Sequence, residues 1–194
     1  EGLRTFGPAV LRAGFDLVTV SIGALADEGL AETLRAAGEA GGAKLHLASG
    51  AIGALDCLRA AKAGSMQEVR YVGRKPPRGW RGSPAEDVLD LDAMTTGAAV
   101  HFSGTAREAA QRYPKNANVA AAVALAGLGF DATSVELIAD ADISANIHEV
   151  HAKGDFGAFT FRIEGATLPD NPRTSALAAM SVVSAIQDKS RTIR

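Results

Sequence analysis

The first third of the chain alternates between short, continuously apolar runs and alanine-rich segments with helical spacing. The runs at 16–22 and 44–49 are too uniformly apolar for strands with one face in water, so they predict buried parallel strands. The segments at 27–39 and 50–63 predict helices that end at glycines, and residues 8–14 predict a short helix that opens on its proline. Strands that alternate with helices at this spacing predict a β-α-β unit and a parallel sheet.

After a boundary near residues 64–68, the pattern changes to that of an α+β lobe with a mostly antiparallel sheet. Strand patterns occur at 68–73, 99–103, 135–139, 145–151 and 157–163, and helical patterns occur at 105–113, 119–128 and 174–186. The last two strands alternate with period two on either side of a glycine-containing turn at 153–157, which predicts a hairpin. The expected fold class is therefore α/β, with a parallel-sheet lobe followed by an α+β lobe.

Composition removes several classes of function. The 194 residues carry 20 Lys and Arg against 22 Asp and Glu, so the net charge of −2 lacks the basic excess of a general nucleic-acid binder. No apolar run approaches membrane-spanning length, and a single cysteine, Cys57, excludes an intrachain disulfide. We expect a cytoplasmic protein with no nucleic-acid or membrane partner and with Cys57 in its core. Because the chain opens on Glu1 and shows no signal pattern, we also expect that an N-terminal portion precedes it.

Four histidines are candidates for catalysis: His46, His101, His148 and His151. Side chains alternate along a strand, so His148 shares one face with Asn146, whereas His151 lies on the other face, toward solvent. A polar pair on one face suits catalysis, but a hydrogen-bonded structural role is the commoner reason for a histidine in a strand. We expect that structural role for His46 and His101. The histidines have no spaced cysteine or carboxylate partners, so we expect no metal site.

An asparagine-rich turn at 114–120 precedes the apolar helix. Asn116 or Asn118 could cap this helix by accepting hydrogen bonds from its free backbone donors. The two amides and the helix N-terminus could instead form a polar pocket that attracts an anion. The sequence leaves both interpretations open.

Two further turns carry small polar groups at places where ligands bind. Ser49 and Gly50 begin the turn after the second strand, at the carboxyl edge of the parallel sheet, yet the Gly-x-Gly-x-x-Gly pattern of dinucleotide-binding folds occurs nowhere. Near the C-terminus, Thr174 and Ser175 follow a turn at 169–172. They either cap the last helix or help to bind a carboxylate.

The chain contains, in this order, the segments Ser49–Asp56, Val69–Pro77, Pro114–Ala121, Asn146–Val150 and Leu168–Leu177. Together they resemble the L-aspartate dehydrogenase family over nearly the whole chain. The resemblance implies an oxidoreductase that uses NAD or NADP to convert L-aspartate to iminoaspartate. This product hydrolyses to oxaloacetate and ammonia, and it can feed NAD biosynthesis.

The resemblance also implies a domain organisation. Residues 1–66 correspond to the C-terminal part of a dinucleotide-binding Rossmann domain, and residues 67–172 correspond to an α+β catalytic and dimerisation domain. Residues 173–194 correspond to a helix that packs back on the Rossmann part. The fold expectation becomes a partial Rossmann-type domain plus an α+β domain.

Residue roles follow from the same resemblance. The family's active-site histidine falls on His148, and water addition to the imine needs a base near neutral pH, which suits an imidazole. The cofactor contacts that the resemblance implies are Ala51 and Asn118, to which we add the neighbouring Ser49 and Gly50. As contacts of the substrate we expect Asn116, Asn146, Thr174 and Ser175.

The chain departs from the family pattern in one respect, since the first strand and the glycine-rich phosphate loop are missing. We therefore expect about 70 further residues in the parent gene product, among them the residue that distinguishes NAD from NADP. Two alternatives remain open. One is another two-domain reductase, resembling dihydrodipicolinate reductase or homoserine dehydrogenase, and the other is a non-catalytic binding or dimerisation module. We also expect a homodimer or a higher homo-oligomer, because flat antiparallel sheets often pair.

Overall fold

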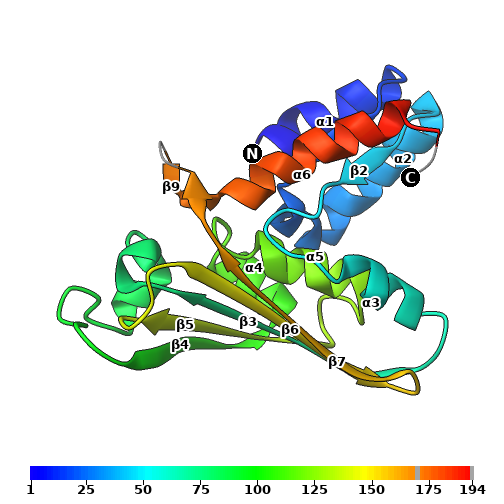
Figure 1. Cartoon of the computed structure of the whole chain (residues 1–194). Coiled ribbons are helices and arrows are strands. Elements are labelled where there is room, and N and C mark those ends of the chain that lie inside the picture. Colours follow the sequence, from blue (N-terminus) through cyan, green and yellow to red (C-terminus); the bar gives the residue numbers. More distant parts are fainter. Residues whose placement is uncertain (169–170, 193–194) are drawn as a thin grey trace.

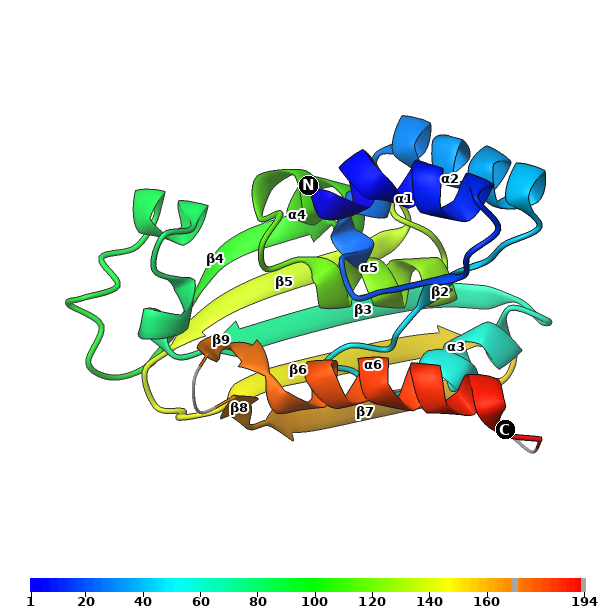
Figure 2. The same cartoon turned by 90° about the horizontal axis from the view of Figure 1, so that it is seen from above.

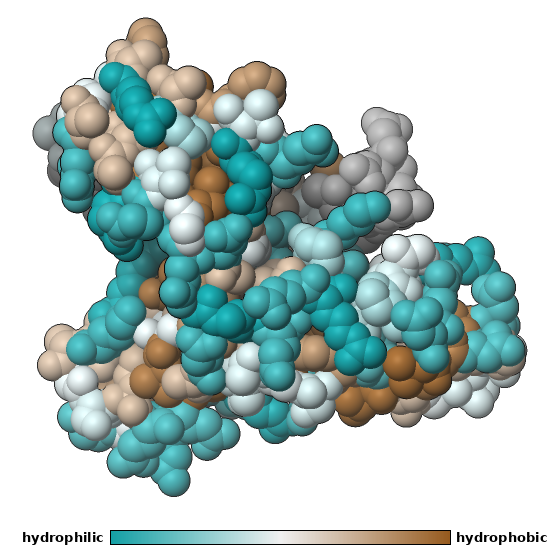
Figure 3. Space-filling view, turned by 180° about the vertical axis from the view of Figure 1, so that it is seen from behind, coloured by the Kyte–Doolittle hydropathy of each residue, from teal (hydrophilic) through white to brown (hydrophobic). Residues whose placement is uncertain are grey.

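The computed structural model describes residues 1–168 and 171–192, which form two lobes (Figure 1). The lower lobe is a five-stranded sheet with helices on one face, and the upper lobe is a group of helices around two short strands. The helices on the sheet are α4 (Ala106–Arg112) and α5 (Asn118–Ala126). The upper helices are α1 (Gly2–Arg12), α2 (Glu28–Gly41) and α6 (Ala176–Gln187). Seen from behind, a notch separates the lobes, and hydrophobic residues occur in small patches among hydrophilic ones (Figure 3).

The upper lobe is the β-α-β unit that the apolar pattern predicts. Strands β1 (Leu17–Thr19) and β2 (Leu45–Leu47) run parallel, and between them the chain passes through the 3-10 turn η1 (Ile22–Ala26) and α2. Asp27 begins α2 by accepting a hydrogen bond from the backbone N–H of Leu30. The lobe therefore has the parallel strands of the prediction, although each strand is only three residues long.

Three elements of this lobe differ from the sequence prediction. Pro8 lies inside α1 and not in its first turn. The first strand, Leu17–Thr19, is shorter than the predicted 16–22, and the last residue of that prediction, Ile22, begins η1. The third helix, α3 (Leu55–Ala61), begins later than predicted. Gly50 and Ala54 have φ values of 70° and 60°, which keep the preceding turn out of the right-handed helical conformation.

The lower lobe is a five-stranded sheet with the order β4-β5-β3-β6-β7. Its strands are β3 (Met66–Lys75), β4 (Ala98–Thr105), β5 (Thr133–Asp140), β6 (Asn146–Gly154) and β7 (Gly157–Gly165). Neighbouring strands are antiparallel except β3 and β5, which are parallel. The α/β fold class with a small parallel sheet and a mostly antiparallel one is thus confirmed, as is the hairpin of β6 and β7.

Alanines of α5 form the centre of the core between this helix and the sheet. The side chains of Ala120, Ala121 and Ala124 are 0% exposed. Small side chains let the helix backbone lie close to the sheet, at the density that protein interiors require. Cys57, which we expected in the core, is instead exposed on α3, so that expectation is wrong.

Helix α6 brings the C-terminal segment back to the upper lobe. It follows strands β8 (Thr167–Leu168) and β9 (Asn171–Ser175), and it lies above β6 and β7 when the molecule is viewed from above (Figure 2). The hydroxyl of Ser181 accepts a hydrogen bond from the backbone N–H of Gly50 at 3.1 Å. Lys189, just beyond α6, pairs with Asp16 next to β1. These contacts hold α6 beside the turn that follows β2.

Candidate functional site

A cavity of about 220 Å³ lies where the ends of several elements converge. Its wall comes from the segments after β1 and β2, the end of β3, the beginnings of α5 and β6, and the start of α6. Most of the residues that we expected in a site line this one cavity: Ser49, Gly50, Ala51, Asn116, Asn118, Asn146, His148 and Ser175. The side chain of Thr174, which we also expected there, lies outside the described residues.

A buried tyrosine holds the imidazole of His148. The Nδ1 atom of His148 lies 2.7 Å from the hydroxyl oxygen of Tyr71, and both side chains are buried. Burial raises the pKa of Tyr71, so its hydroxyl stays protonated. Burial, together with the nearby ammonium group of Lys75, lowers the pKa of His148 to about 4. We expected a base that titrates near neutral pH, but this pKa is lower. His148 is therefore an uncharged imidazole at physiological pH, and Nε2 is the nitrogen that Tyr71 leaves free.

Gly73 provides the space for this pair. It lies opposite His148 in the register of β3 and β6. A Cβ atom at position 73 would lie 2.7 Å from the hydroxyl oxygen of Tyr71, a separation that Cβ atoms do not adopt without a shift of the neighbour. Any side chain at this position would displace the tyrosine from His148.

Lys75 lines the same cavity, and our sequence prediction did not include it. Its ammonium group lies 5.0 Å from the centre of the Trp80 ring, and burial lowers its pKa to about 8. The predicted strand ended at residue 73, whereas β3 continues through Lys75. Period-two alternation from Tyr71 through Gly73 was the signal that could have placed Lys75 on the cavity face.

Asn118 does not cap its own helix. Its Oδ1 atom accepts a hydrogen bond from the backbone N–H of Gly23 at 2.9 Å, which fixes the amide between α5 and η1. No side-chain cap is present at the start of α5, so the capping interpretation is wrong for both Asn116 and Asn118. With Oδ1 engaged by Gly23, the Nδ2 group of Asn118 remains as a hydrogen-bond donor.

Two small residues add polar groups to the cavity wall. The turn at Gly50 has open space beside it, because a Cβ atom there would meet nothing within 4 Å. The hydroxyl of Ser175 is buried and has no hydrogen-bond partner among the described residues. Since buried hydroxyls in folded proteins are normally paired, a bound ligand is a natural partner for Ser175.

The other three histidines lie away from this cavity. His101 is buried against Trp80 and contacts the hydroxyl of Tyr113, in the structural role that we expected. His46 contacts Asp16 at the surface, and the side chain of His151 is 35% exposed. In the part of the chain that the structure describes, no group of three His, Cys, Asp or Glu side chains is arranged to hold a metal ion.

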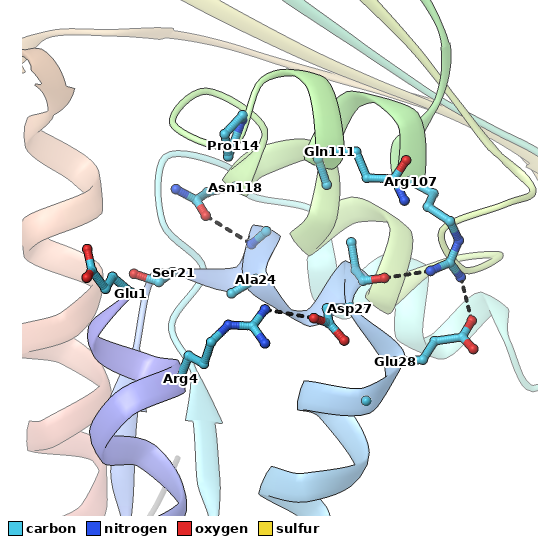
Figure 4. A pocket seen from close by; sticks show the side chains of 14 residues that line it. Glu1, Arg4, Ser21, Ala24, Asp27, Glu28, Arg107, Gln111, Pro114 and Asn118 are labelled. Atoms are coloured by element: carbon cyan, nitrogen blue, oxygen red, sulfur yellow. Dashed lines mark hydrogen bonds and ion pairs between the residues drawn. The ribbon is translucent and has the colours of Figure 1, made fainter.

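A second cavity of about 820 Å³ shares Asn118 with the first and lies between η1, α2 and α4 (Figure 4). Its charged side chains pair with one another: Arg4 bonds to Asp27, and Arg107 bonds to Glu28. Because carboxylates already neutralise these arginines, this cavity attracts an anion less strongly than the His148 cavity does.

No helix within 1–168 and 171–192 has the length and apolar character needed to cross a lipid bilayer.

The groups around His148 fit the nicotinamide end of a dinucleotide. A nicotinamide ring needs an apolar surface and partners for its carboxamide. Ala51 and Val20 supply apolar surface, and the Nδ2 group of Asn118 would be placed to donate to a carboxamide oxygen. The open backbone turn at Gly50 leaves room for a ring to approach.

Comparison with known proteins gives matches over the whole chain. Two family models match: "Aspartate dehydrogenase, C-terminal" over residues 56–189, and "Homoserine dehydrogenase, NAD binding domain" over residues 1–48. The L-aspartate dehydrogenase of Ruegeria pomeroyi is 60% identical over 194 residues, which are 100% of this chain and 70% of that protein. The L-aspartate dehydrogenase of Cupriavidus necator is 52% identical over 183 residues, which are 94% of this chain and 68% of that protein.

A solved structure agrees with these matches. The crystal structure of aspartate dehydrogenase from Thermotoga maritima has a TM-score of 0.79 and 28% sequence identity, over 99% of this chain and 73% of that one. An NAD-binding lobe joined to an α+β lobe defines a two-domain oxidoreductase with a nicotinamide cofactor, NAD or NADP. Within this class, the chain belongs to the aspartate dehydrogenase family. The family resemblance and the prediction of an enzyme are thereby confirmed.

Proposed function

We propose that the cavity around His148 binds L-aspartate and oxidises it with NAD or NADP. The product is iminoaspartate, which hydrolyses to oxaloacetate and ammonia, and the reverse reductive amination uses the same site. The observation that carries this proposal is the convergence of a neutral His148, the Lys75 ammonium group and the Asn118 amide in one cavity, in a chain of the aspartate dehydrogenase family. We further propose that iminoaspartate formed here feeds NAD biosynthesis.

The cofactor contacts come from two turns of this chain. When bound, the nicotinamide supplies the acceptor for the hydride that leaves the α-carbon of aspartate. Ser49, Gly50 and Ala51 would hold the cofactor at the open backbone turn after β2. The Asn118 amide, which Gly23 fixes in place, would donate a hydrogen bond to the cofactor.

The proton transfers belong to His148. The substrate amine must be neutral before hydride leaves, and a proton must also leave the water that adds to the imine carbon. The Nε2 atom of neutral His148 accepts these protons one at a time and releases the first to solvent before it takes the second. This role requires the tautomer that carries its hydrogen on Nδ1, which donates it to the Tyr71 oxygen and so fixes the orientation of the ring. The substrate contacts that we propose around this atom are Asn116, Asn146, Thr174 and Ser175.

The test is consumption of NADH or NADPH by the natural gene product with oxaloacetate, measured with and without ammonium. Consumption that depends on ammonium is the expected result. Consumption without ammonium would indicate a keto-acid reductase of similar build. If neither condition gave consumption, the proposed substrate would be wrong.

The domain roles that we propose follow the two lobes. Residues 1–66 bind the cofactor as part of a Rossmann domain, residues 67–172 supply the α+β catalytic and dimerisation domain, and residues 173–194 pack back on the first. The contact of Ser181 with Gly50 supports this role for the last segment. We propose a cytoplasmic location because the lone Cys57 suits a reducing compartment.

We propose that the open face of the five-stranded sheet forms a homodimer or a higher homo-oligomer. No described helix covers this face (Figure 1). Val72, Ile138 and Ile147 lie on it outside the main core, but their side chains are only 3–5% exposed. Val100, next to Ile138 in the register of β4 and β5, is 52% exposed. Light scattering after gel filtration should give a mass of at least two chains, and Val100→Lys should lower it. Val183→Lys on α6 is the matched control, and a monomeric native protein would contradict the proposal.

A further inference from the structure

Lys75 is a cation of the His148 cavity for which the described residues provide no acidic partner. No carboxylate in the described part of the chain lies within ion-pair distance of its ammonium group, which instead lies over the Trp80 ring. We propose that Lys75 binds one carboxylate of a four-carbon dicarboxylate and so selects dicarboxylates over monocarboxylates. This inference rests on the proposed function, because it assigns the substrate class of that same site.

The position of Lys75 in β3 directs it to the cavity face. Side chains alternate along a strand, so Lys75 shares a face with Tyr71 and Gly73. Gly73 lies opposite His148, and the Lys75 charge is close enough to contribute to the low pKa of His148. A carboxylate on Lys75 would therefore lie beside the reacting imidazole.

The turn that follows β3 holds the lysine stem in place. The 3-10 turn η2 (Pro77–Trp80) folds over it, and a Cβ atom at Gly79 would lie 3.2 Å from the Cβ of Lys75. The Trp80 ring lies beneath the ammonium group, and the Trp80 Nε1–H donates to the backbone oxygen of Ile138 at 2.9 Å. Stem and ring are thus packed before any ligand binds, which reduces the entropy that ligand binding costs.

Neighbouring arginines of β3 show what distinguishes Lys75. Arg70 pairs with Glu136 at 2.8 Å, and Arg74 pairs with Asp140 at 3.0 Å, both on the opposite face of the sheet. Each of these cations has its own carboxylate from β5, whereas Lys75 on the cavity face has none among the described residues. A partly buried ammonium group without a counter-ion favours an anionic ligand.

Binding of such an anion also changes His148. The positive charge of Lys75 opposes protonation of the imidazole, and a bound carboxylate neutralises that charge. The pKa of His148 then rises toward neutrality when a dicarboxylate is present. The chain thereby couples occupation of the site by its correct substrate to the basicity of its proton acceptor.

The experiment compares native protein with Lys75→Met, which keeps the apolar stem, and with Lys75→Arg, which keeps the charge. Calorimetry measures the affinity of each protein for succinate, a dicarboxylate, and for butyrate, a monocarboxylate. Steady-state kinetics are measured with L-aspartate. For Lys75→Met we expect succinate affinity to fall and KM for aspartate to rise, each by about 10- to 100-fold, with a smaller change in kcat. Lys75→Arg should restore part of the affinity. Lys153→Met, which replaces an exposed lysine near the end of β6, is the control.

A third readout separates a binding role from a structural one. In native protein, succinate should raise the pKa of His148 in an NMR titration, and Lys75→Met should abolish that rise. Native protein that turns over aspartate, with unchanged KM and succinate affinity in Lys75→Met, would overturn the inference and leave the proposed function intact. Succinate binding that depends on Lys75, in a protein that does not oxidise aspartate, would support the inference and refute the proposed function. Native protein that fails to bind succinate would overturn the inference.

Discussion

The hydroxyl oxygen of Tyr71 lies 2.7 Å from Nδ1 of His148, across the pairing of β3 with β6. The two rings are nearly parallel, with centroids 6.0 Å apart. Because burial raises the pKa of Tyr71, the hydroxyl keeps its proton over the working range of the protein. Nδ1 is thus occupied by a partner that stays neutral, and Nε2 is the nitrogen left for the proton transfers that we propose.

Removal of that hydroxyl should slow the reaction without unfolding the protein. We expect Tyr71→Phe to reduce kcat about threefold to tenfold, because one net hydrogen bond that orients the imidazole is lost. Tyr113→Phe is the matched control, since its buried hydroxyl contacts His101 at 3.1 Å, away from the cavity. Both variants should lose about 1 kcal/mol of unfolding free energy in urea, and only Tyr71→Phe should lose rate.

Replacement of the histidine itself should have a larger effect. We expect His148→Ala to reduce turnover about 10²- to 10⁴-fold, because it removes the proton acceptor, while NADH affinity stays nearly unchanged. Initial rates give the first quantity, and quenching of NADH fluorescence on binding gives the second. His151→Ala, on the same strand and partly exposed, should behave like the native protein. Turnover at the native rate in His148→Ala would remove this residue from the mechanism.

Gly73 allows a test of the geometry rather than of the chemistry. We expect Gly73→Ala to reduce kcat at least as much as Tyr71→Phe does, because its Cβ would lie 2.7 Å from the tyrosine oxygen. Gly2→Ala, whose Cβ meets nothing within 4 Å, is the control. In the double variant Gly73→Ala/Tyr71→Phe the closest contact is gone, so its loss of stability should be smaller than the sum of the two single losses. Additive losses would show that the clash is not with the hydroxyl.

Local patterns in the sequence predicted the parts of this site that lie within one element. Alternation along β6 placed His148 and Asn146 on one face, and both line the cavity. Alternation along one strand did not predict the contact of His148 with Tyr71, which is separated from it by 77 positions in the chain. That contact depends on the register between β3 and β6, and many residues of each strand together determine this register.

Backbone conformation explains the helix that the pattern misplaced. The small residues of 50–54 are compatible with helix by composition, and the prediction therefore began the helix at Gly50. In the structure, Ala54 takes a φ of 60°, a conformation rare for a residue with a Cβ. Such strained conformations cluster at functional sites, and the turn before Ala54 lines the cavity through Gly50 and Ala51.

Acid should destabilise the protein through two buried histidines. Burial lowers the pKa of His101 and His148 to about 4, whereas an unfolded histidine titrates near 6.5. Between pH 6.5 and 4 the unfolded state therefore binds more protons than the native state, and stability falls as the pH falls. Each histidine should contribute a slope of about 1.4 kcal/mol per pH unit in the middle of this window. Urea unfolding measured from pH 7 to pH 4 gives the free energy of unfolding at each pH. This free energy should fall less steeply with pH in His101→Gln than in the native protein, and as steeply in His151→Gln as in the native protein. Equal slopes in all three proteins would mean that His101 takes up its proton in the native state as readily as in the unfolded chain.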